Sequence, residues 1–131
     1  MKYLNDYTQD ATSKTLKNNG AFFCFNDKQF NEQKTEGVKY VHLYGGLIAP
    51  KSNVKALLVE LDKVQSIGIA QDVKDNGIKA VIWRELANFE SQISISCEDT
   101  INALQDYPIT ENEIRKQFKL YMDHCVKNDL F

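Results

Sequence analysis

Apolar residues recur at helical spacing along most of the chain, and these stripes predict its helices. The clearest stripe lies within residues 77–90, where the apolar side chains fall on one helical face: Ile78, Val81, Ile82, Leu86 and Phe89. Similar stripes between polar capping residues and Asn or Gly stop signals predict further helices over residues 4–17, 54–64, 68–76 and 98–107, after Asn26 or Asp27, and after Thr110.

Continuous and alternating apolar runs predict the strands. Residues 21–25 form a short apolar run, typical of a strand buried on both faces. Residues 38–44 alternate, and Gly45-Gly46 breaks or bulges that strand before it resumes at residues 47–49. Gln92 to Cys97 alternate as well and predict a half-buried strand. The pattern predicts an α+β fold in one globular domain, residues 1–131: a small antiparallel or mixed sheet of about three strands covered by five or six helices.

Composition narrows the class of protein. A hydrophobic content of 43% is enough for one ordinary core. A net charge of −2 is neither the basic excess expected of a general nucleic-acid binder nor the acidity of a strong DNA mimic. Cys24, Cys97 and Cys125 are widely spaced and form no C-x-x-C motif, which predicts buried free thiols in a reducing compartment. No apolar run could span a membrane and no secretory signal is visible, so we expect a cytoplasmic protein without membrane contact.

Sequence motifs give no support to a cofactor, a metal ion or a catalytic residue. The chain contains neither G-x-G-x-x-G nor G-x-x-x-x-G-K-[ST], the glycine motifs of nucleotide-binding sites. Gly45-Gly46 is better explained as a bulge or turn than as a phosphate cradle. It also lacks a G-x-S-x-G elbow, and neither His42 nor His124 has a second ligand at metal-binding spacing. The sequence therefore disfavours an enzyme and predicts no cofactor and no metal.

A group of polar residues on the central helix is the strongest candidate site. This recognition patch consists of Trp83, Arg84, Glu85, Asn88 and Glu90. Trp and Arg are the residue types most enriched at binding hot spots, so the patch would contact a macromolecular partner. The alternative is an ordinary amphipathic helix whose Trp covers a core edge and whose Arg pairs with a local carboxylate.

Two further functions remain open on the sequence. Nucleic acid could contact the aromatic strand face and the basic side of the last helix: Tyr40, His42, Tyr44, Arg115, Lys116 and Lys119. A helix that covers the aromatic face is the alternative there. The carboxylates of Glu85, Glu90 and Asp99 could instead serve a small enzyme acting on a nucleotide, if they meet in a pocket.

Several segments together resemble a family of small proteins carried by phages, prophages and mobile elements of bacteria, a domain of unknown function. They are residues 19–30, 37–40, 84–88 and 108–110. Relatives place a His between the residues equivalent to Asn88 and Glu90, where this chain has Phe89, so His-dependent chemistry does not transfer. The resemblance implies a bacterial cytoplasm and a small phage-type accessory protein that binds a host or anti-phage defence protein.

Exposed apolar surface also predicts association. A sheet with few strands leaves an edge open unless helices cover it, and apolar area is costly to leave in water. We therefore expect a homodimer, formed through either the Gln92–Cys97 edge or the outer face of the last helix.

Overall fold

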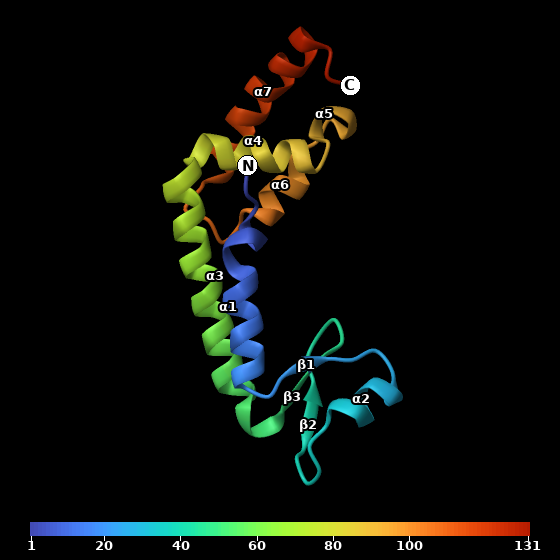
Figure 1. Cartoon of the computed structure of the whole chain (residues 1–131). Coiled ribbons are helices and arrows are strands. Elements are labelled where there is room, and N and C mark those ends of the chain that lie inside the picture. Colours follow the sequence, from blue (N-terminus) through green and yellow to red (C-terminus); the bar gives the residue numbers. More distant parts are fainter. The chain divides into compact units, whose positions relative to one another are not determined.

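The computed structural model describes residues 1–131, which form two compact units, Met1–Gly68 and Ile69–Phe131. The first unit holds α1 (Leu4–Asn18), β1 (Phe22–Phe23), α2 (Asp27–Gln33), β2 (Tyr40–His42), β3 (Leu47–Pro50), the 3-10 turn η1 (Lys51–Asn53) and the first part of α3 (Val54–Asn76). The second holds the end of α3, then α4 (Ile78–Asn88), α5 (Ser91–Ser94), α6 (Glu98–Ala103) and α7 (Glu111–Asn128) (Figure 1). The predicted α+β class is confirmed, with seven helices instead of five or six. The single domain stays a prediction.

The first unit is built around β3, the central strand of an antiparallel sheet ordered β1-β3-β2. All of Leu47–Pro50 is buried, as expected for a short apolar run with a neighbour on each side. A core cluster joins this strand to the helices and consists of Ala21, Leu47, Ala49 and Leu57, with Leu16, Leu43, Val54 and Leu61 packed against it.

Of the bulge and the turn that the sequence allowed at Gly45-Gly46, the structure has the turn. Gly45 and Gly46 have φ angles of 55° and 80°, so the chain reverses there and β2 and β3 form a hairpin. One expectation about this sheet was wrong. The run at residues 21–25 yields only a two-residue edge strand. β1 is an edge strand that ends at Phe23, and Phe23 and Phe25 are exposed, so this run is not buried on both faces.

α3 is a single helix of 23 residues where the sequence predicted two shorter ones. Gly68 does not interrupt it. A Cβ at this position would collide with Thr8 Cγ2, so the glycine allows α1 to lie close to α3. The predicted end of the helix is confirmed at Asn76-Gly77, where Gly77 has a φ of 81°. No helix of the chain is both long enough and apolar enough to cross a membrane.

The second unit packs α4 against its neighbours through the predicted stripe. Val81, Ile82 and Leu86 are fully buried and share the core with residues from α6 and α7. Thr110 caps α7, since Glu113 N donates to Thr110 Oγ1 at 3.2 Å, and the Thr110 hydroxyl donates to Glu113 Oε1 at 3.3 Å. Local patterns therefore predicted these helices correctly.

The predicted strand at Gln92–Cys97 is absent, and the segment forms the one-turn helix α5 followed by a turn. All three strands of the protein lie between residues 22 and 50, so this segment has no strand of the second unit to pair with. Its ends are set by left-handed residues instead, Glu90 with φ 49° and Ile95 with φ 54°. Ile93 and Ile95, which the alternation had predicted to face inward, are exposed to solvent. The segment also offers no strand edge for a dimer.

Candidate functional site

A buried ion pair fixes the middle of the second unit. The guanidinium of Arg84, on α4, donates from Nη1 to Asp72 Oδ1 at 2.8 Å and from Nη2 to Asp72 Oδ2 at 3.0 Å. This bidentate geometry is the strongest that Arg and a carboxylate adopt. Arg84 Nε also donates to Glu85 Oε1 at 2.8 Å, so one guanidinium holds two carboxylates.

Asp72, at the end of α3, is completely buried and fully engaged. Tyr107, which follows α6, donates its hydroxyl to Asp72 Oδ2 at 2.5 Å, and Asn76 Nδ2 donates to Oδ1 at 2.8 Å. Together with Arg84 these donors satisfy the carboxylate, as a charge removed from water requires. The network thus ties the end of α3, the middle of α4 and the segment after α6 to one point.

The pKa values in this network favour the charged pair. Burial acts to raise the pKa of Asp72, but the hydrogen bonds from Arg84, Tyr107 and Asn76 and the charge of Arg84 outweigh it, and the pKa lies below its ordinary value. Burial would lower the pKa of Arg84, yet its bonds to Asp72 and Glu85 raise it. Burial and the bond to Asp72 raise the pKa of Tyr107, so this hydroxyl remains a donor.

The predicted recognition patch is divided by this arrangement. Arg84 and Glu85 are only 6% and 8% exposed, whereas Asn88 and Glu90 are exposed. Arg84 and Asn88 therefore do not form the shared surface that their spacing suggested. Arg84 pairs with the adjacent Glu85, the local carboxylate of the alternative interpretation, and also with the distant Asp72. Arg84 follows Val81 by three residues, which was the available sign that it faces inward.

Trp83 lies at the edge of the core between α4 and α7. Its Nε1 donates to Gln117 Oε1 at 2.8 Å, and its ring meets Tyr121 edge-on at 5.4 Å between centroids. His124 and the ammonium group of Lys79 flank the same ring at 5.3 Å and 5.2 Å. Trp83 thus covers a core edge and leaves a partly exposed face.

Three exposed apolar residues of this unit lie where α4 ends and α5 begins, and we call this surface, with its polar neighbours, the α4–α5 corner: Asn88, Phe89, Glu90, Ile93 and Ile95. Ile93 is 59% exposed and Ile95 is 74% exposed. Figure 1 shows α5 as a separate short turn beyond the end of α4. The corner includes two members of the predicted patch, Asn88 and Glu90, and adds apolar residues that the alternation had assigned to a strand.

The other candidate residues are dispersed. Glu85 is buried on Arg84, while Glu90 and Asp99 are exposed, so the three carboxylates proposed for catalysis do not form one site. Arg115 donates to Glu98 and Glu111, which neutralises much of the basic side of α7. Lys116 and Lys119 are exposed.

The aromatic strand face is partly covered, as one of the two interpretations expected. Tyr40 packs edge-on against Phe22 and Phe30, each at 5.6 Å between centroids, and its hydroxyl accepts from Thr35 N. Tyr44 lies beyond β2 and is exposed. A continuous stacking surface of Tyr40, His42 and Tyr44 is therefore not available.

The three cysteines are free and buried, as predicted. Burial raises the pKa of the Cys97 thiol, and burial with a hydrogen bond to Cys125 raises the pKa of Tyr121 to about 12. No group of three or more His, Cys, Asp and Glu side chains is arranged to hold a metal ion.

Comparison with known proteins gives one match. A model of a protein family, described as a family of unknown function, matches residues 4–124. No curated protein and no solved structure matches the chain.

Proposed function

The chain belongs to this family of unknown function, DUF7659, and we propose that it acts without catalysis, by binding a protein partner through the α4–α5 corner. The partner is a host protein or an anti-phage defence protein, and the setting is the cytoplasm of a bacterium in which the chain is a phage-type accessory protein. The resemblance of residues 19–30, 37–40, 84–88 and 108–110 to proteins of phages and prophages supports this setting.

The observation that carries the proposal is a pair of exposed isoleucines, Ile93 in α5 and Ile95 at its C-terminal cap. Apolar surface in water costs roughly 25 cal/mol per Å², and Ile93 and Ile95 leave most of their side chains uncovered. Ile95 also adopts a left-handed backbone, which is unfavourable by about 1–2 kcal/mol for an L-residue and rare for a β-branched one. Neither feature stabilises the folded chain, whereas a partner that buries both side chains would benefit from them.

The buried Arg84 network supports the proposal by holding the base of the corner in place. α4 is fixed to the end of α3 by the ion pair with Asp72, and α5 is attached to the chain after α7 because Gln92 Nε2 donates to Leu130 O at 3.1 Å. A surface held in this way loses little conformational freedom on binding. The exposed Glu90 carboxylate at the rim favours a partner with hydrogen-bond donors around an apolar pocket.

Capture of the partner from a bacterial lysate, followed by binding of the purified partner, tests this proposal. Ile95→Ser should weaken binding about tenfold or more, as truncation of a central apolar contact does. Ile67→Ser is the matched control, because Ile67 on α3 is 71% exposed and undergoes the same change in chemistry. Equal binding by the two variants would contradict the proposal.

A further inference from the structure

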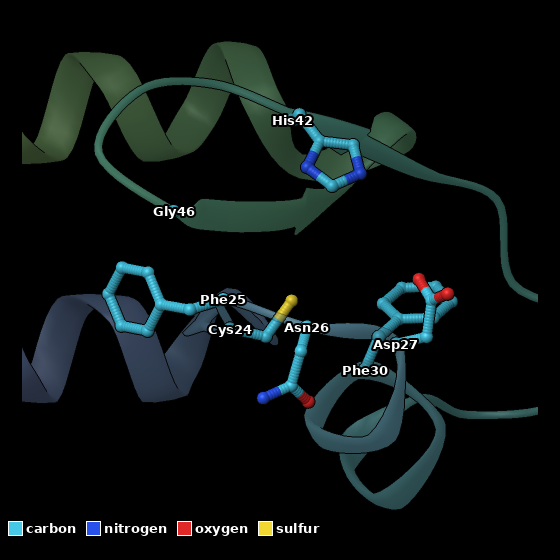
Figure 2. Close-up of a pocket in the computed structure, with 7 residues that line it drawn as sticks. All are labelled: Cys24, Phe25, Asn26, Asp27, Phe30, His42 and Gly46. Carbon is cyan, nitrogen blue, oxygen red and sulfur yellow. The ribbon is translucent and has the colours of Figure 1, made fainter.

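A cavity of about 520 Å³ opens in the first unit, between β2 and the segment that joins β1 to α2. Figure 2 shows the imidazole of His42 on the β2 side, with Asp27 and Phe30 together at one end and Phe25 at the other. The thiol of Cys24 lies between them. This volume is within the range of small-molecule sites.

Hydrogen bonds fix the wall of the cavity that residues 24–27 form. Cys24 N donates to Gly46 O at 2.9 Å, and Gly46 has a φ of 80°, which favours glycine; a Cβ there would also lie 2.5 Å from Phe25 Cε1, so the Phe25 ring would have to move. Asn26 caps α2 by accepting from Gln29 N at 2.9 Å, and Phe25 N donates to Gln29 Oε1 at 2.7 Å. The wall formed by residues 24–27 is therefore anchored at both ends.

The polar groups around the cavity differ in whether they already have partners. Asn26 and Gln29 are used by the cap, and the Tyr40 hydroxyl accepts from Thr35 N. The carboxylate of Asp27 and the imidazole of His42 line the cavity and have no hydrogen bond or ion pair with the rest of the chain. These two groups are thus free to meet a ligand.

Aromatic rings line the cavity beside Asp27 and His42. Phe30 lies three residues after Asp27, on the same side of α2, and its ring is held by Phe22 and Tyr40 at 6.3 Å and 5.6 Å between centroids. Tyr40 and His42 are two residues apart on β2 and share a face of the sheet. The Lys34 ammonium group lies 6.0 Å from the Phe30 centroid, so one cation already makes a cation–π contact with this ring and a ligand would have to use the rest of its surface.

We propose that this cavity binds a small planar organic cation, of the amidine or guanidine class, whose N–H groups donate to the Asp27 carboxylate while its flat face lies between Phe30 and His42. The carboxylate needs donors and favours positive charge, and the aromatic rings favour a flat cation. No Lys or Arg lines the cavity, so an anion would meet Asp27 without compensation. The site is in the first unit and is independent of the α4–α5 corner.

Three probes of similar shape and different charge test this proposal: benzamidine, benzamide and benzoate. Each is titrated into the full-length protein labelled with ¹⁵N, and binding is followed by the amide chemical shifts of residues 24–30 and 42–46. Benzamidine should bind about tenfold more tightly than benzamide, because its hydrogen bonds to the carboxylate are charge-assisted, and benzoate should bind most weakly. Equal affinity for the three probes, preference for benzoate, or no shift in these residues would overturn the proposal.

Substitutions test whether Asp27 is the group that recognises the cation. Asp27→Asn keeps the shape of the side chain and should abolish the preference for benzamidine over benzamide, while His42→Ala should weaken both probes by a similar factor. Asp10→Asn is the matched control, since Asp10 is an exposed aspartate on α1 that does not line the cavity. An unchanged preference in Asp27→Asn, or the same loss in Asp10→Asn, would show that Asp27 does not recognise the cation and would refute the proposal.

Discussion

Arg84 holds two carboxylates inside the second unit, those of Asp72 and Glu85. Arg84→Met removes the guanidinium and leaves Asp72 buried without its main partner, which should lower the free energy of unfolding by about 3–5 kcal/mol. Urea denaturation followed by circular dichroism measures this change. Asp72→Asn combined with Arg84→Met should cost less than the sum of the single changes, since no uncompensated charge then remains. Full additivity would show that the two residues act separately.

The same carboxylate predicts how stability depends on pH. Asp72 has a lowered pKa in the folded state, so its charged form contributes stability that is fully present above the ordinary value of 3.8. This contribution is lost as the pH falls through the lowered folded-state pKa. Asp72→Asn has no titrating group at this position, so it should be less stable than the native chain at neutral pH. It should also lose less stability than the native chain as the pH falls from about 5 to about 2, the range around the ordinary Asp pKa. Parallel acid curves for the two proteins would contradict this assignment.

At the scale of single elements, α5 combines strain and exposure at Ile95. Ile95→Gly removes the energetic cost of a left-handed backbone at an L-residue, about 1–2 kcal/mol. The greater freedom of Gly in the unfolded chain offsets part of this gain, so the free energy of unfolding should rise by about 1 kcal/mol. The same change removes an apolar contact and should weaken partner binding. Thermal denaturation and a binding titration on one sample measure both effects. A variant that is both less stable and weaker in binding would point to a structural role for Ile95 instead.

Elements governed by local chemistry were predictable from the sequence, and those governed by distant partners were not. Asn26 and Thr110 cap their helices as expected, because a cap involves only the next few residues. The alternation in Gln92–Cys97 was misleading, because a strand needs a neighbouring strand and the second unit contains none. Likewise Arg84 was recognised as a special residue, but its partner Asp72 is twelve positions away on another helix and no local pattern connects them.

The candidate sites were likewise predictable only where they depend on local sequence. Asn88 and Glu90 were predicted as members of a recognition patch on the surface, and both are exposed. The cavity beside His42 was not predicted, since it requires the antiparallel pairing of β1 and β2 with β3 and the close approach of Gly46 to Phe25. Sequence periodicity shows which way a side chain faces on its own element, but which elements meet depends on the packing of the whole chain.

At the scale of the whole molecule, association is the remaining prediction. The strand edge at Gln92–Cys97 is absent, and β1 and β2, the outer strands of the sheet, have only two and three residues and offer little edge for pairing. The outer face of α7 remains, where Met122 and Val126 are four residues apart and Val126 is 67% exposed. We therefore propose a homodimer in which α7 packs against its own copy about a two-fold axis.

Light scattering behind a sizing column tests the dimer. The native chain should give twice the 15.0 kDa mass of one chain, and Val126→Glu should return it to a single-chain mass because two carboxylates would face each other across the axis. Val59→Glu on α3, where Val59 is also exposed, is the matched control and should leave the dimer intact. A native mass that stays near 15.0 kDa as the protein concentration rises through the micromolar range would refute the dimer, and loss of the dimer in both variants would place its interface elsewhere than α7.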